Sequence, residues 1–225
     1  MKVTDLGLAP YREVEALQLR TVDEVIAGGE ETLFLVEHPP VITLGRGGGA
    51  EHLHMDQAWL AKRGVEVVRI ARGGNVTCHF PGQLVAYPVF RVSRGRGGVR
   101  GFFHNMERAV LETLAAFGLE ARRVEGRPGV WMDAARKICS MGIGVRRWVA
   151  FHGLALNVLP DVSLFDLVTP CGLIDVRATS LHAELDRLGV SGKPTMEEVK
   201  HVLARQIRDA FAHPQVAAAS PAARP

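Results

Sequence analysis

Residues 73–90 read GGNVTCHFPGQLVAYPVF, the longest interior stretch of the chain without a Lys, Arg, Asp or Glu. The stretch holds three glycines and two prolines, so it cannot cross a bilayer as a helix. A segment that is rich in turn-forming residues yet uncharged is better suited to line a pocket than to form a solvated loop. Its second half, residues 84–90, is predicted as a strand. We therefore expect residues 73–90 to place a strand beside a binding pocket.

The composition is that of a globular protein. The chain has 225 residues, 47% hydrophobic and 23% charged, which is enough to bury a substantial core. A formal net charge of +3 is only mildly basic, so neither nucleic acid nor a membrane is an expected partner. Three cysteines, at positions 78, 139 and 171, form no paired spacing and fit a reducing compartment. Residues 1–20 carry charges where a signal peptide needs an apolar segment, so we expect a cytoplasmic protein.

Helices and strands follow one another without steady βαβ alternation. The expected strands are residues 32–36, 41–44, 65–70, 84–90, 129–132, 136–145 and 148–158, and the expected helices are residues 10–26, 56–63, 100–117 and 195–212. The last helix begins at Thr195, which has the capping-box spacing to Glu198. This order predicts an α+β fold with a mixed or largely antiparallel sheet. We expect one domain over residues 1–214 and a disordered tail over residues 215–225.

Cys171 is a candidate nucleophile. It lies between a proline and a glycine, in a turn with little side-chain bulk to shield a thiolate. A reactive cysteine needs a group that lowers the pKa of its thiol. Lys137 is a candidate for that group, and strand alternation predicts that it shares a face with Cys139 and points away from Ile138. By residue type alone, a buried structural cysteine and an exposed strand lysine are the commoner cases.

Residues 72–83 hold the most unusual mixture of small and polar residues. Glycines let a ligand approach the backbone, and Arg, Asn, Thr and His supply polar contacts; a structural turn is the alternative. The stretch lacks the Gly-Lys-Ser/Thr ending of a phosphate-binding loop. No cysteine or histidine spacing matches a zinc motif, so no metal is expected. His152 interrupts an apolar strand and is interpreted as a hydrogen-bonded core histidine.

Several stretches of the chain match, in their order and spacing, the motifs of one known family. They are residues 37–46, 72–88, 129–131, 137–138, 151–158, 170–172 and 179–181. In this combination the sequence resembles the octanoyltransferases of lipoate biosynthesis, which belong to the superfamily with the biotin and lipoate protein ligase fold. The resemblance covers residues 35–181 and is highly specific. The chain departs from it at Cys78, Phe80 and Cys139, where Tyr, Gly and a small residue are usual.

The resemblance implies an enzyme that moves an octanoyl group from octanoyl-acyl carrier protein to a lysine of lipoyl domains. The implied acceptors are 2-oxoacid dehydrogenase complexes and the glycine cleavage H protein. The implied fold is biotin/lipoate ligase-like, with a mixed sheet, a smaller sheet, surrounding helices and an acyl tunnel. Cys171 is implied as the acyl-accepting nucleophile and Lys137 as the residue that lowers its pKa. The implied substrate-binding residues are Arg72, Gly73, Gly74, Asn75, Val76, Thr77, Cys78, His79, Ser140, Met141, Gly142, Gly153, Leu154 and Ala155.

A thioester route implies neither ATP nor a metal as cofactor, because conversion of a thioester to an amide is downhill. In that route Lys137, assisted by His79, takes up the proton of the acceptor lysine. We expect a monomer. Five arginines in two loops either steer acidic partner proteins or only solubilise the loops; they are Arg91, Arg94, Arg96, Arg146 and Arg147.

Three other functions remain open from the sequence. An ATP-dependent lipoate or biotin protein ligase has the same fold but needs no nucleophilic cysteine, so Cys171 in Pro-Cys-Gly argues against it. A non-catalytic acyl-binding or lipoyl-domain-binding module would leave Cys171 as a packed thiol. A basic RNA-binding protein is the weakest alternative, since no nucleic-acid motif is present.

Overall fold

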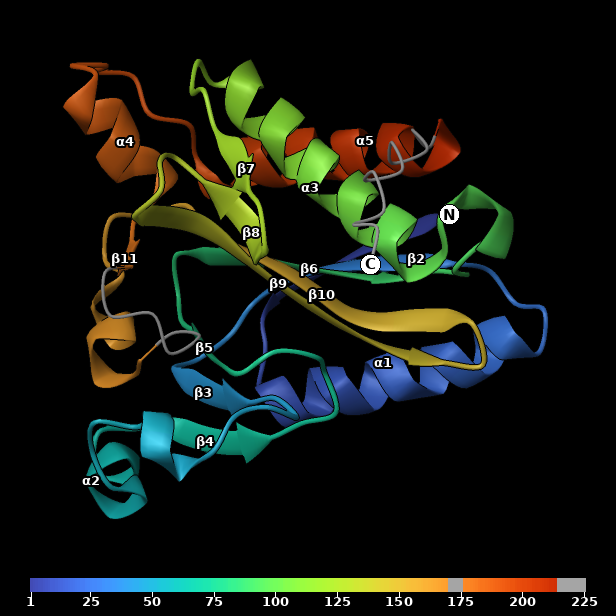
Figure 1. Cartoon of the computed structure of the whole chain (residues 1–225), viewed down its shortest axis with the longest axis horizontal. Helices are drawn as coiled ribbons and strands as arrows, with labels where there is room; N and C mark the ends of the chain where they lie inside the picture. Colours follow the sequence, from blue (N-terminus) through green and yellow to red (C-terminus); the bar gives the residue numbers. More distant parts are fainter. Residues whose placement is uncertain (170–175, 214–225) are drawn as a thin grey trace, which may run out of the picture.

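The computed structural model describes residues 1–169 and 176–213 (Figure 1). A large sheet of eight strands runs through its centre in the order β1-β2-β6-β10-β9-β8-β7, with β11 paired to β9. Its strands are β1 (Lys2–Leu8), β2 (Thr32–Glu37), β6 (Gln83–Val89), β7 (Arg122–Val124), β8 (Arg127–Trp131), β9 (Arg136–Arg146), β10 (Val149–Asn157) and β11 (Arg177–Ala178). The β1–β2 and β9–β11 pairs are parallel and the other neighbours are antiparallel. The predicted α+β fold with a mixed sheet is confirmed.

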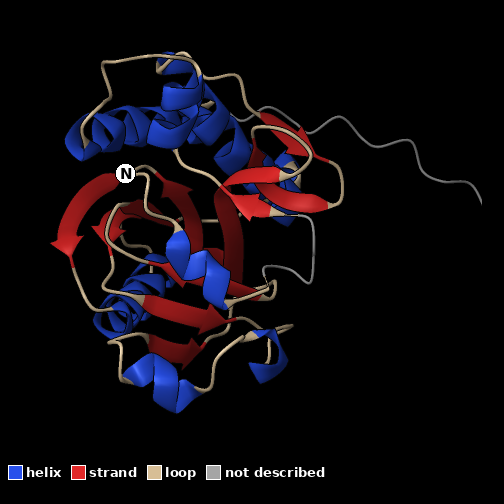
Figure 2. Ribbon diagram, turned by 90° about the vertical axis from the view of Figure 1, so that its left-hand side faces the viewer, coloured by secondary structure: helices blue, strands red, loops and turns tan. Residues whose placement is uncertain are grey.

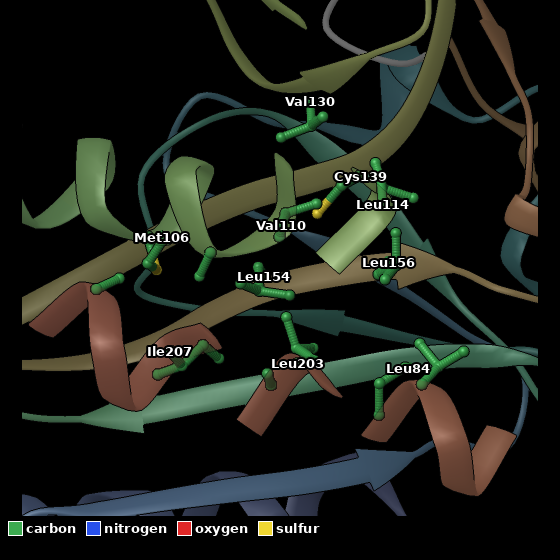
Figure 3. Packing of buried hydrophobic residues seen from close by; sticks show 14 of the residues in the cluster. Leu84, Met106, Val110, Leu114, Val130, Cys139, Leu154, Leu156, Leu203 and Ile207 are labelled. Carbon is green, nitrogen blue, oxygen red and sulfur yellow. The ribbon is translucent and has the colours of Figure 1, made fainter. Parts of the chain in front are cut away.

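Two long helices cover one face of the large sheet. These are α3 (Gly98–Ala116) and α5 (Met196–Ala212), which pack on each other above the sheet (Figures 1 and 2). The buried side chains between helices and sheet include Met106, Val110, Leu154, Leu203 and Ile207 (Figure 3). Each Å² of apolar surface that is buried stabilises the folded state by about 25 cal/mol. This cluster is therefore a main source of the free energy of folding.

The predicted capping box at the start of α5 is present. The N–H of Glu198 donates to Thr195 Oγ1 at 3.3 Å, and the N–H of Thr195 donates to the Glu198 carboxylate at 2.7 Å. These reciprocal bonds satisfy backbone donors that the first helical turn leaves without intrahelical partners. A second short helix, α4 (Leu181–Arg187), precedes α5 and begins at Ser180.

One helix covers the opposite face of the sheet. This helix, α1 (Tyr11–Ile26), follows Pro10, whose missing N–H costs nothing at a helix start. Val14, Val22 and Val25 are buried in the cluster that α1 shares with β6 and β10. The two faces of the sheet therefore carry separate cores.

A second, smaller sheet lies on the side of the large sheet away from α3 and α5 (Figure 2). It has the order β4-β3-β5, formed by β3 (Val41–Leu44), β4 (Glu66–Arg69) and β5 (Val76–His79). Around it lie α2 (Gln57–Ala61) and the 3-10 turn η3 (Ser163–Leu167); the other 3-10 turns are η1 (Ala50–His52) and η2 (Arg94–Arg96). Its own core includes Ile42, Leu60, Val76, Cys78 and Phe165.

The elements that sequence analysis did not predict are β1, β5, β7, β11 and α4. β1 contains a register shift between Asp5 and Leu8, with Gly7 at a φ of +60°, and this interrupts the alternation that identifies a strand. The other four have two to seven residues, too few for a periodic pattern. The predicted hairpin of residues 136–158 is confirmed, with Arg147 and Trp148 in its turn at φ of +48° and +65°. The predicted tail, residues 215–225, lies outside the described residues.

Candidate active site

A pocket of about 340 Å³ lies between the two sheets. One wall is the part of the large sheet where β6, β10 and β9 are neighbours. The other wall is the glycine-rich backbone around Arg72–Thr77, which leads into β5 of the small sheet. Antiparallel pairing sets the sheet wall, because it places Ser140 opposite Ala155 and Met141 opposite Leu154. The pocket is therefore formed by segments that are far apart in the chain, from Tyr11 to Ala155.

Gly142 is the point where the two walls meet. The N–H of Gly73 donates to the carbonyl of Ile143 at 3.0 Å, which docks the loop on β9. A Cβ on Gly142 would lie 3.0 Å from the Gly73 oxygen and 3.2 Å from Arg72 Cδ. Only glycine lets the loop come this close without a shift.

Arg72 is a buried cation in this wall. Its Nη2 donates to the carbonyl oxygen of Thr43 at 2.9 Å and to Thr43 Oγ1 at 3.0 Å, and its Nη1 donates to the Gly73 oxygen. A buried guanidinium needs oxygen acceptors, and these oxygens of β3 and the loop accept from both of its terminal nitrogens. The bonds fix Arg72 to the small sheet while its stem covers Gly142.

Lys137 lies at the other end of the lining, at the start of β9. Its Nζ lies 5.0 Å from the centre of the Trp131 ring, within the range of a cation–π contact. Trp131 is the cross-strand neighbour of Lys137, so the two side chains share a face. Gly129, at a φ of +115°, passes beneath the lysine, and a Cβ there would lie 2.8 Å from Lys137 Cε.

The prediction that Lys137 and Cys139 share a face of the strand is wrong. The pairing shifts by one residue between Val130–Cys139 and Trp131–Lys137, so Ile138 is an extra residue in β9. The bulge turns Lys137 to the pocket and leaves both Ile138 and Cys139 in the core under α3. Figure 3 shows Cys139 among Val110, Leu114 and Val130. Burial raises the pKa of the Cys139 thiol to about 12, so this thiol is inert.

Three buried histidines and two tyrosines gather at the pocket, and all of them except His38 are in its lining. Tyr11 stacks on His79 with ring centres 5.8 Å apart, and His38 meets His79 edge-on at 5.6 Å. His38 Nδ1 donates to the Ala9 oxygen at 2.7 Å, which leaves Nε2 to accept the Tyr87 hydroxyl at 2.9 Å. The Tyr11 hydroxyl lies 3.4 Å from His152 Nδ1.

Burial keeps these histidines neutral. It lowers the pKa of His38 to about 4 and that of His152 to about 3, and in His152 the Arg72 charge adds to the effect. The pKa of His79 lies well below its usual value, first because of burial and then because His38 is close. The pocket therefore presents neutral imidazoles near a single buried guanidinium.

Most residues that the resemblance implied for the site are neighbours in the structure. Those that line the pocket are Arg72, Gly74, Asn75, Val76, Thr77, His79, Lys137, Ser140, Met141, Gly142, Gly153, Leu154 and Ala155. Gly73 contributes its backbone bond to β9 but is not in the lining. The Cys78 side chain points into the core of the small sheet, where its thiol donates to the Leu164 oxygen at 3.5 Å. Cys171 lies outside the described residues. Whether these residues bind substrate stays a prediction.

Sequence reasoning missed six lining residues. They are Tyr11, Gly47, Val85, Tyr87, Pro128 and His152. Tyr11 was interpreted only as part of a helix start, and no local signal shows that it meets residues 140 positions away. His152 carried a usable signal in the sequence, because a histidine that interrupts an apolar strand needs a polar partner. In the structure its φ of +59° is uncommon for a residue other than glycine and accompanies its place in the pocket.

A comparison with known proteins identifies the family. An octanoyltransferase from Nitratidesulfovibrio vulgaris (strain DP4) is 62% identical over 218 residues, which are 97% of this chain and 98% of that protein. The chain belongs to the octanoyltransferase family. The model of the lipoyl protein ligase A/B catalytic domain matches residues 10–208. The predicted family and the predicted class of enzyme, a transferase, are confirmed.

Solved structures confirm the predicted biotin/lipoate ligase-like fold. A lipoate-protein ligase A bound with ATP has a TM-score of 0.73 at 19% identity and covers 94% of this chain and 86% of its own. A biotin protein ligase from Leishmania major in complex with biotinyl-5-AMP has a TM-score of 0.55 at 14% identity. The match covers 94% of this chain and 75% of the ligase chain. At such identities the likeness concerns the fold alone.

The described part of the chain shows neither a metal-binding cluster nor a membrane-spanning helix. Residues 1–169 and 176–213 contain no group of three or more His, Cys, Asp or Glu side chains arranged to hold a metal ion. In the same residues, no helix has the length and apolar character needed to span a bilayer.

Gly129→Ala is expected to displace Lys137. The new Cβ would meet the Cys139 carbonyl and Lys137 Cε, and the φ of +115° already disfavours an L side chain. We expect octanoyltransferase activity to fall at least about ten-fold, with a loss of roughly 1–3 kcal/mol in unfolding free energy from urea denaturation. Gly126→Ala is the matched control, because Gly126 has a φ of +72° but no atom within 4 Å of the new Cβ. Equal activity in the two variants would contradict the placement of Lys137 above Gly129.

The neutral histidines predict a loss of stability in mild acid. The unfolded chain takes up protons near the ordinary histidine pKa of about 6.5, whereas His38, His79 and His152 in the folded chain do so only at lower pH. Stability is therefore fully present above pH 6.5 and falls as pH drops toward 4. Each histidine contributes a slope of up to about 1.4 kcal/mol per pH unit.

His152→Asn tests this, since asparagine tolerates a positive φ and does not titrate. Between pH 6 and 5 its unfolding free energy should depend less steeply on pH, by about 1.4 kcal/mol per unit. His201→Asn, on the exposed side of α5, is the control that changes the histidine count without touching the pocket. An unchanged slope in His152→Asn would show that His152 is protonated in the folded protein.

Proposed function

We propose that the chain transfers an octanoyl group from octanoyl-acyl carrier protein to a lysine of lipoyl domains, through a thioester on Cys171. The observation that carries the proposal is an apolar pocket with Lys137 in its lining, in a chain 62% identical to an octanoyltransferase. Val76, Val85 and Leu154 give the pocket apolar walls. Each methylene buried there contributes about 0.8 kcal/mol, so an eight-carbon chain gains several kcal/mol.

The proposed first step forms the acyl-enzyme. The Lys137 ammonium favours the Cys171 thiolate, because a nearby opposite charge stabilises the charged form of the thiol. The thiolate attacks the carbonyl carbon of the donor thioester, and backbone N–H groups stabilise the oxyanion. The carbon–sulfur bond to the carrier then breaks, and the carrier sulfur takes a proton from Lys137. An octanoyl thioester and a neutral Lys137 remain.

In the proposed second step, neutral Lys137 takes a proton from the ammonium group of the acceptor lysine. The freed amine attacks the octanoyl carbonyl, the bond to Cys171 sulfur breaks, and one proton passes to water. The products are an amide, the Cys171 thiolate and the Lys137 ammonium, so the starting pair is restored. Amide formation from a thioester is downhill, so the route needs neither ATP nor a metal ion.

The chain register supports a place for Cys171 near Lys137. The described residues nearest to Cys171 in the sequence are Thr169 before it and residue 176 after it. Ala178 is paired in parallel with Lys137. The N–H of Thr179 donates to the Lys137 oxygen at 2.9 Å. Ala178 is only seven residues after Cys171 in the sequence, and this short spacing supports the proposed action of Lys137 on the Cys171 thiol.

The partners and the compartment are part of the proposal. Two of the five arginines expected to steer acidic partners make internal contacts: Arg91 donates to the Val25 oxygen, and Arg146 pairs with Asp23. Arg147 is exposed at the tip of the β9–β10 hairpin, where Arg94 stacks on Trp148 at 4.2 Å. These groups are the better candidates for contact with an acyl carrier protein or a lipoyl domain. We propose a monomer in the cytoplasm, where free thiols such as Cys78 and Cys139 persist.

The decisive experiment is incubation with octanoyl-acyl carrier protein in the absence of ATP. Intact mass and peptide mapping should find one octanoyl group on Cys171, which leaves when a lipoyl domain is added and gains the group. Cys171→Ala and Cys171→Ser should form no adduct and lose transfer. Modification of the lipoyl domain only with ATP and free octanoate would instead make the chain a ligase, and unchanged transfer in Cys171→Ala would exclude the thioester route.

Lys137 variants separate the two proposed steps. Lys137→Arg keeps a positive charge but cannot give up its proton, so the Cys171 thiol should stay reactive toward iodoacetamide while octanoyl transfer falls. Lys137→Met removes the charge, and alkylation at pH 7 should slow by about ten-fold as the thiol returns toward a pKa of about 8.5. Lys193→Met, on the surface beside Asp186, is the control. Fast alkylation of Cys171 in Lys137→Met would exclude the proposed effect of Lys137 on the thiol.

A further inference from the structure

A chain of buried hydrogen bonds joins His79 to the strand that carries Lys137. His79 Nδ1 lies 2.8 Å from Gln83 Oε1, and Gln83 Nε2 lies 2.9 Å from Asn157 Oδ1. Asn157 Nδ2 lies 2.9 Å from the carbonyl oxygen of Thr179, whose own N–H donates to the Lys137 oxygen at 2.9 Å. All four polar residues from His79 to Thr179 are buried, with exposures of 0–6%. The chain thus connects β5 of the small sheet with β6, β10 and β9 of the large one.

The direction of every bond in this chain is fixed by backbone groups. The Thr179 carbonyl only accepts, so the Asn157 amide must turn its NH₂ toward it and its oxygen toward Gln83. Gln83 Nε2 also donates to the Cys78 carbonyl at 3.1 Å, which fixes the Gln83 amide independently. Gln83 therefore presents an oxygen to His79, and an amide oxygen can only accept. His79 must carry its proton on Nδ1.

The other ring nitrogen of His79 is then an acceptor. A neutral imidazole with a proton on Nδ1 has a lone pair on Nε2. Nδ1 is held by Gln83, and His79 is part of the pocket lining, so the opposite edge of the ring is the one left to meet a ligand. The opposite tautomer would place the Nδ1 lone pair against the Gln83 oxygen. In a buried site, the missing hydrogen bond would destabilise that tautomer.

We infer that Gln83 and Asn157 are positioning residues that lock His79 in its Nδ1–H tautomer, so that Nε2 accepts a hydrogen bond from the acceptor lysine amine. The inference rests on the proposed function for the identity of that amine. It adds no proton transfer: the lone pair of Nε2 orients the N–H of the amine, and the proton of the incoming ammonium goes to Lys137. Neither Gln83 nor Asn157 is in the pocket lining, so the two amides act through His79.

The charges around His79 favour this role over that of a base. Tyr11 and His38 are the rings packed against it, and the positive charge of Arg72 also acts on it. Burial and these neighbours hold the pKa of His79 well below its usual value, so protonation is disfavoured. A neutral acceptor that cannot become a cation holds an amine without competing for its proton.

The test reads the tautomer directly by long-range ¹H–¹⁵N NMR on the full chain labelled with ¹⁵N-histidine, at pH 7.5. His79, assigned by the signals lost in His79→Gln, should show a protonated Nδ1 and an unprotonated Nε2. A protonated Nε2 overturns the inference, whatever the activity. This measurement needs no substrate, so it stands even if octanoyl transfer is not found, whereas absence of transfer from wild-type protein defeats the proposed function.

Variants of Gln83 test whether the tautomer of His79 affects octanoyl transfer. Gln83→Met removes the acceptor, and we expect mixed tautomers together with an at least ten-fold slower transfer from acylated enzyme to a lipoyl domain, while Cys171 acylation keeps its rate. Gln18→Met is the matched control. Gln18 is also buried, and its side-chain oxygen accepts a hydrogen bond from the backbone N–H of His152 at 2.8 Å. The variant therefore loses a buried hydrogen bond that does not involve His79. A wild-type rate of transfer in Gln83→Met, or mixed tautomers in Gln18→Met, overturns the inference.

Discussion

The close approach of the Arg72–Gly73 backbone to Gly142 is the contact on which the rest of the site depends. It joins two sheets that otherwise have separate cores, and it does so through main-chain atoms, because a side chain at Gly142 would keep the sheets apart. The space that remains on either side of the contact is the pocket. Arg72 is buried as a consequence, and its bonds to Thr43 hold the loop on the small sheet.

The electrostatic character of the pocket follows from this arrangement. Burial keeps the histidines beside Arg72 neutral, and for His79 and His152 the positive charge of Arg72 adds to this effect. In the proposed route, the neutral histidines act only as hydrogen-bond donors and acceptors, and Lys137 is the group that moves protons. An apolar acyl chain can then be enclosed beside polar groups whose partners are already fixed within the protein.

Much of the fold could be predicted because its signals are local. The capping box at Thr195, the hairpin of β9 and β10, and the pocket-lining character of the glycine-rich stretch each depend on a few neighbouring residues. The sequence did not reveal the bulge at Ile138, because it arises where β8 pairs with β9, and it reverses the face expected for Cys139. Tyr11 and His152 were missed in the site for the same reason: their meeting depends on how α1 crosses the sheet. The role of Cys171, outside the described residues, stays a prediction.

The central position of β10 has a consequence for how the protein is made. β10 pairs with β6 on one side and β9 on the other, and the bond between Gln83 and Asn157 spans 74 residues of chain. Such distant pairings form slowly, because loop closure must precede any gain in contact energy. During synthesis the unit of β1, α1 and β2 can form early, but the pocket has only one wall until β10 has entered the sheet. Under the proposed function, an acyl ligand is therefore retained only by the completed chain, once the whole sheet has formed.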